Sequence, residues 1–173
     1  MGSAQLGTTG AAVNISQFSG DMNVSTTGAN IKIDKFEGAL SATTTAGDIT
    51  AALTQSTDQK SGDIKLNATM GDISLQIPEN LSTTIDITLA YTRGIFKNYK
   101  IKSNLALEQK RTDIWDDQFG TPRKFIYGKG LLNEGIHEIQ LSTTNGHVKL
   151  ETVNASPIHQ TVSHKQHDQQ SDQ

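Results

Sequence analysis

Apolar and polar residues alternate along this chain in short runs, most of which follow a glycine. In a β-strand such alternation places every second side chain on one face, whereas in a helix residues two apart lie on opposite sides. The pattern therefore predicts short β-strands with one buried face, and it places Ile49, Ile64 and Ile73 in the core. The clearest runs occupy residues 21–24, 30–33, 48–51, 63–66, 72–77 and 147–150.

The glycines recur at steps of eight to ten residues, with one longer gap, between Gly10 and Gly71. A corner of the chain often requires a positive φ, which glycine adopts readily, and a neighbouring Asp or Asn can bond the backbone of the turn. We interpret these positions as structural turns. They are Gly20, Gly28, Gly38, Gly47, Asp48, Gly62, Asp63, Gly71, Asp72 and Gly146.

We call a glycine and the alternating run that follows it a phrase, and two successive phrases make a coil of about eighteen residues. Stacked coils would each bury the apolar row of the neighbouring coil, as repeat proteins do. A β-sandwich is the alternative, but its strands usually pair through hairpins. The near-constant phrase length favours an all-β, single-stranded β-solenoid with short glycine-cornered coils.

The regular spacing of the glycines is lost between residues 91 and 135. Nine of the fifteen Lys and Arg residues lie here, and loops are expected near residues 113–117 and 120–122. We expect residues 1–9 to be a leading segment, 10–151 the solenoid domain with 91–135 irregular, and 152–173 a disordered polar tail. The start Met1-Gly2-Ser3 is typical of a sequence added for expression, so a native leader or anchor could have been removed.

Composition narrows the classes of function. The formal net charge is -3, which predicts no general affinity for nucleic acid. The absence of cysteine excludes disulfides and thiolate metal sites. No apolar stretch of the sequence is long enough to span a membrane.

Three phrases carry a resemblance to a known family: residues 43–49, 69–78 and 144–150, with Gly-Asp-Ile or a close variant in each. They resemble the bacterial "putative adhesin" domains of unknown function, over residues 10–95 and 136–151. The resemblance implies a right-handed, single-stranded β-helix, usually attached to an export signal or membrane anchor. It implies no catalytic residues.

Acidic residues and histidines are the candidates for chemistry. Four aspartates could bind calcium if they stacked along one edge: Asp21, Asp48, Asp63 and Asp72. The sequence lacks the Gly-Gly-x-Gly-x-Asp spacing of calcium-binding rolls, which favours a turn-capping role for these residues. Asp116 and Asp117 are adjacent, whereas a glycoside hydrolase needs two separated acids in a cleft. His137 and His147 are expected to face solvent, and no frame would hold the other histidines: His159, His164 and His167. We therefore expect no catalytic residue, metal or cofactor.

The aromatic and basic stretch is the strongest candidate for binding. Aromatic rings beside cations can stack on sugars or anchor a protein. The alternative is that the aromatics, Phe125 among them, plug the open end of the solenoid. The candidate partner-binding residues are Tyr91, Phe96, Tyr99, Trp115, Phe119 and Tyr127.

The sequence thus predicts a non-enzymatic cell-envelope β-solenoid that displays a surface for adhesion or assembly. Its expected partner is an extracytoplasmic protein or glycan, and a homo-oligomer is compatible with the sequence. One alternative is a structural or signalling module that docks on a membrane-protein partner. A polysaccharide-active enzyme of the β-helix type is the third hypothesis.

Overall fold

The computed structural model describes residues 2–54, 62–94, 98–118 and 120–154, and all regular secondary structure in these ranges is β. None of the described residues form a helix long and apolar enough to cross a membrane. The fourteen strands join into one strongly curled sheet, so the all-β prediction is confirmed.

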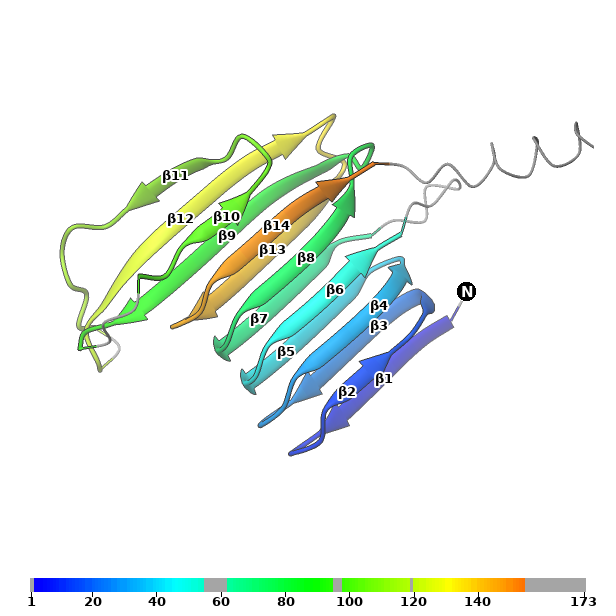
Figure 1. Ribbon diagram of the computed structural model, residues 1–173, viewed down its shortest axis with the longest axis horizontal. Coiled ribbons are helices and arrows are strands. Elements are labelled where there is room, and N and C mark those ends of the chain that lie inside the picture. The colour runs from blue at the N-terminus through cyan, green and yellow to red at the C-terminus, as the bar shows by residue number, and fades with distance from the viewer. Residues whose placement is uncertain (1, 55–61, 95–97, 119, 155–173) are drawn as a thin grey trace, which may run out of the picture.

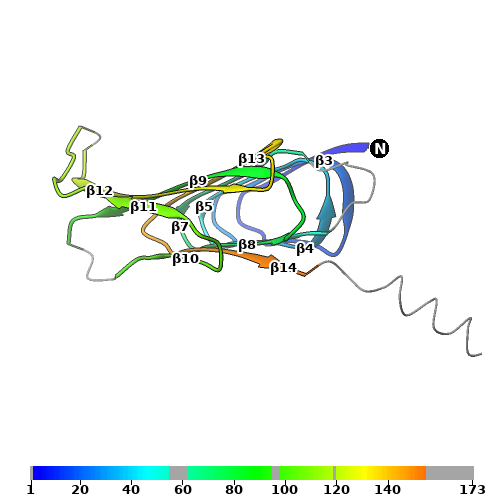
Figure 2. The same ribbon diagram turned by 90° about the horizontal axis from the view of Figure 1, so that it is seen from above.

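The curled sheet forms two facing layers, which Figure 2 shows from above. The first residues of β3, Phe18 and Ser19, pair with β4 of the back layer, while the rest of β3 pairs within the front layer. The front layer contains β1 (Gly2–Thr8), β3 (Phe18–Thr26), β5 (Leu40–Ala46), β7 (Ile64–Met70), β9 (Thr83–Thr92), β11 (Glu108–Arg111), β12 (Arg123–Leu132) and β13 (His137–Thr144). The back layer contains β2 (Val13–Ile15), β4 (Ile31–Glu37), β6 (Ile49–Leu53), β8 (Ile73–Pro78), β10 (Ile101–Ser103) and β14 (Val148–Val153).

From β1 to β8 the chain alternates between the layers, so one strand from each makes a coil. Equivalent residues of neighbouring coils pair in parallel at a spacing of 18 residues, as Gly2 does with Gly20 and Ile31 does with Ile49. The spacing rises to 24 between Ile49 and Ile73, where the intervening chain includes residues 55–61, outside the described ranges. Parallel pairing throughout this region makes the fold β-solenoid-like rather than a hairpin-connected sandwich.

The space between the layers holds the apolar row of each strand. Ile49, Ile64 and Ile73 are at most 1% exposed, and Ile49 and Ile73 are directly paired between coils. The alternation of the sequence therefore identified the inward face correctly.

The coils do not stack in the order in which they occur along the chain. Strand β13 lies between β7 and β9 and is parallel to both, while β14 lies between β8 and β10. Figure 1 shows this late coil, in orange, inside the stack rather than at its end. We call β13 and β14 the inserted coil.

An antiparallel group closes the far end of the stack. Strand β12 pairs with β9, and β11 pairs with β12, both in the antiparallel sense. A side chain at Gly130 would contact Leu107, and one at Gly128 would contact Ile101. These two glycines leave room for Leu107 and Ile101 against the core. Residues 99–118 and 120–132 therefore form a cap, which we call the capped end.

Strands extend past two of the expected boundaries. Residues 1–9 were expected to lead into the fold, but Gly2–Thr8 form β1 and pair with β3 along its length. This strand has a weak apolar pattern and is held through its backbone, so alternation could not reveal it. At the other end β14 continues to Val153, past the predicted start of the tail at Thr152, and residues 155–173 lie outside the described ranges.

Candidate functional site

The corner aspartates form hydrogen bonds between coils. Asn30 Oδ1 accepts the backbone N–H of Asp48, Asp48 Oδ1 accepts that of Asp72, and each bond is 2.8 Å long. The series continues as Asp72 Oδ1 accepts the N–H of His147 at 2.8 Å and His147 Nδ1 accepts the N–H of Lys100 at 3.1 Å. We call this series the corner ladder.

The ladder gives these aspartates a structural role that the sequence described only as turn capping. At another corner Asp63 Oδ1 accepts the N–H of Glu138 at 2.9 Å, so this carboxylate also joins two coils. Asp21 is exposed on β3. In the described part of the chain no three or more His, Asp or Glu side chains group in a way that could hold a metal ion.

Most of the predicted turn glycines lie where neighbouring backbones approach closely. A side chain at Gly38, whose φ is +112°, would overlap the carbonyl oxygen of Gly20 in the adjacent coil. A side chain at Gly28 would only reach ordinary contact distance, 3.6 Å from the oxygen of Thr9. The other close positions are Gly20, Gly47, Gly62, Gly71 and Gly146.

The candidate aromatic residues separate into different environments. Tyr99 is buried in the core of the capped end and lies 5.2 Å, between ring centroids, from His147. His147 and His137 were expected to face solvent, and both are partly buried: His147 belongs to the corner ladder, and His137 begins β13. Phe96 and Phe119 lie outside the described residues.

Trp115 lies half-buried on the loop between β11 and β12. Its ring lies nearly perpendicular to that of Tyr91, with centroids 5.9 Å apart, while Lys124 Nζ and Arg93 Cζ lie 4.9 and 5.8 Å from the ring centroid. The backbones of Asp116 and Arg123 exchange two 2.8 Å hydrogen bonds beside it. Because its ring already has these partners, Trp115 fixes the loop against β9 and β12.

Tyr127 lies on the outward face of β12. Its ring is nearly parallel to that of Phe125, with an interplanar angle of 13° and centroids 5.8 Å apart. Together with Glu108, Lys110 and Lys129 it lines a cavity of about 330 Å³. The cross-strand register places Lys110 opposite Tyr127 and Glu108 opposite Lys129. We call this cavity the β11–β12 groove.

The groove ends a row of polar side chains that crosses the front layer. The residues paired in this row change from hydroxyl and amide groups in the middle of the stack to an aromatic ring and a cation at the capped end. In spatial order they are Ser25, Thr43, Asn67, Ser142, Thr88, Tyr127 and Lys110.

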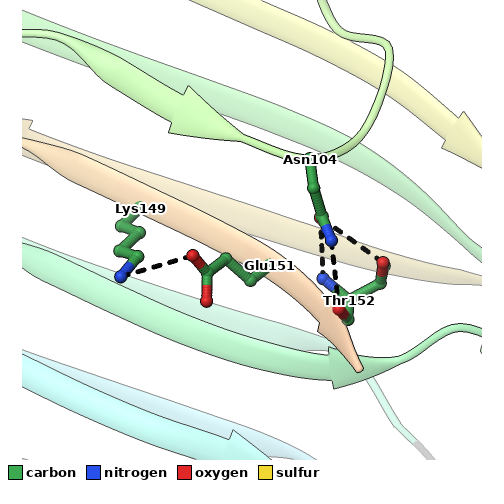
Figure 3. Close-up of polar contacts among 4 residues, drawn as sticks. All are labelled: Asn104, Lys149, Glu151 and Thr152. Atoms are coloured by element: carbon green, nitrogen blue, oxygen red, sulfur yellow. Dashed lines mark hydrogen bonds and ion pairs between the residues drawn. The ribbon is translucent and has the colours of Figure 1, made fainter. Parts of the chain in front are cut away.

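A side-chain clip joins the capped end to the inserted coil, and sequence reasoning missed it. Asn104 Nδ2 donates to the carbonyl oxygen of Thr152 at 3.1 Å, and Asn104 Oδ1 accepts the N–H of Thr152 at 2.9 Å (Figure 3). Lys149 and Glu151 form a 3.3 Å ion pair on the same strand. A lone Asn gives no sequence signal for such a clip, because its partner strand is 48 residues away.

These features define a β-solenoid-like protein with hydrogen-bonded corners and one capped end. The chain belongs to the family described as Toastrack DUF4097, whose model matches residues 2–114. This assignment supports the resemblance to an uncharacterised family, and the matched region ends before β12, β13 and β14.

A solved structure shows a distant likeness. It is the crystal structure of a "putative cell adhesion protein" from Clostridium sporogenes, with a TM-score of 0.45 and 7% sequence identity. The alignment covers 87% of this chain and 92% of that protein. The comparison with curated proteins gave no match.

Proposed function

We propose that this protein is a non-enzymatic β-solenoid module of the cell envelope that presents a binding surface for adhesion or assembly. The observation that carries the proposal is the concentration of half-buried aromatic and exposed or half-buried cationic groups at the capped end. Strands β11 and β12 together contain five cationic residues and one acidic residue. The rest of the front face offers mainly hydroxyl and amide groups.

The fold suits presentation of such a surface. Parallel coils with bonds at their corners hold the outward side chains in fixed rows, so little conformational entropy is lost when a partner binds. Crossover connections between parallel strands of one sheet are almost always right-handed, which supports a right-handed wind for the stack. The extracytoplasmic location rests on the likeness of the Gly-Asp-Ile phrases to those of exported adhesin-like domains.

A capture experiment from bacterial envelope extract tests the proposal. The immobilised wild-type chain is compared with a Tyr127→Ser, Lys129→Gln double variant and with a Thr43→Ala, Lys65→Gln control. The control changes the front face in the middle of the stack, where Thr43 and Lys65 are exposed. Circular dichroism first establishes that all three proteins are folded.

We expect the wild type and the control to retain the same glycan or protein, and the double variant to lose it. Equal retention by all three proteins would contradict binding at the capped end. Capture of an integral membrane protein through the same residues would favour the alternative, a module that docks on a membrane-protein partner.

A further inference from the structure

We infer that the β11–β12 groove is a binding site for an acidic sugar unit of a polysaccharide. This inference rests on the proposed function and specifies the class of ligand. It joins three properties of the groove: an aromatic surface, a surplus of ammonium groups and a carboxylate that can accept hydrogen bonds from hydroxyl groups.

The aromatic surface comes from the ring of Tyr127, which stacks beside that of Phe125. The C–H groups on one side of a sugar ring are apolar and slightly positive, and they match the negative face of an aromatic ring. The phenol hydroxyl adds a donor and acceptor at the end of that surface. The cavity of about 330 Å³ lies within the size range of small-ligand sites and has room for a sugar unit.

The charges of the groove favour an anion. Lys110 lies 3.6 Å from Glu108, and both side chains are largely exposed. Lys129 faces Glu108 on one neighbouring strand and Asp86 on the other, yet it forms no ion pair within the described residues. Two ammonium groups thus line the groove beside one carboxylate, and among the described residues no ion pair competes with a ligand carboxylate for Lys129.

Glu108 distinguishes a sugar from other anions. A carboxylate accepts hydrogen bonds only, so beside two lysines it can hold the hydroxyl groups of a ligand but repels a second negative charge. An acidic peptide would bring carboxylates but neither the ring hydroxyl groups nor a flat C–H face. A polyhydroxylated ring with a single carboxylate matches all four side chains: Glu108, Lys110, Tyr127 and Lys129.

Titration of the whole chain with defined oligomers tests this site. Tetragalacturonate is the acidic-sugar probe, cellotetraose is the uncharged sugar control, and tetraglutamate is the acidic peptide control. Binding is followed by calorimetry and by the NMR shifts of the β11 and β12 amides. We expect only tetragalacturonate to bind, and its affinity to fall about tenfold in Lys129→Gln and in Tyr127→Ser.

The matched control is Lys65→Gln, which removes a cation from the same exposed face away from the groove and should leave the affinity unchanged. Lys129 is exposed, so its substitution keeps the test valid if Tyr127→Ser does not fold. Equal binding of cellotetraose or of tetraglutamate would overturn the inference, as would no binding by the wild type. Retention of a protein from envelope extract without any sugar binding would reject this inference and leave the proposed function standing.

Discussion

At the scale of single residues, the corners show what a local pattern can and cannot reveal. The glycine rhythm identified Gly38 and Gly71 as corners because their positive φ angles are a local requirement. The acceptor role of Asp72 was also foreseeable, but its partner was not. Asp72 bonds His147, which is 75 residues away, so the bond depends on which coils become neighbours.

Replacing Gly38 with alanine is expected to lower the free energy of unfolding by about 3 kcal/mol, because the new methyl group meets a backbone carbonyl that cannot move aside. Gly10→Ala is the matched control, since nothing lies within 4 Å of a side chain at that position. Urea unfolding followed by circular dichroism measures both variants. Equal transition midpoints would show that the corners do not touch as described.

At the scale of elements, alternation predicted the strands that bury a regular apolar row. It did not reveal β1, which is held by backbone pairing, nor the glycines of β12. Gly128 and Gly130 make room for Ile101 and Leu107, which pack over them. This contact cannot be predicted without knowing how the cap folds. The candidate aromatics were predicted as one group, and the division of the described ones between core, loop and groove depends on the antiparallel pairing of β9 and β12.

Loss of the clip should loosen β10 from β14. Asn104→Ala removes the three side-chain bonds to Thr152, so we expect faster hydrogen exchange of the Thr152 amide and a loss of about 1 kcal/mol in stability. Asn104→Asp keeps the acceptor and should protect that amide better than alanine does. Asn14→Ala, on the exposed face of β2, serves as the control. Unchanged exchange at Thr152 in Asn104→Ala would refute the clip.

At the scale of the whole molecule, the sequence predicted stacked coils but not their order. The apolar rows of the coils are alike: Ile64 pairs with both Leu40 and Ile139. Any coil can therefore pack on any other, and the order depends on the connections and on the capped end. A repeat pattern contains no direct signal for a coil that returns to the middle of the stack.

Removal of the inserted coil should be far more damaging than removal of an end coil. A chain that stops at Gly135 leaves β7 and β9 without the strand that joins them, so we expect loss of cooperative unfolding. Deletion of residues 1–17 removes β1 and β2 from the edge and should leave a folded protein of lower stability. Circular dichroism and urea unfolding compare the two. A cooperative transition in the chain ending at Gly135 would show that the inserted coil is dispensable.

The inserted coil also bears on how the chain is made. Ile139 follows its partner Ile64 by 75 residues, which a ribosome needs about 4 to 15 seconds to add. Throughout that interval the edge of β7 has no neighbour on one side, and unpaired strand edges invite association with other chains. The nascent chain therefore depends on the inserted coil to cover a strand edge that is exposed early in translation. That edge of β7 is where chaperones would bind.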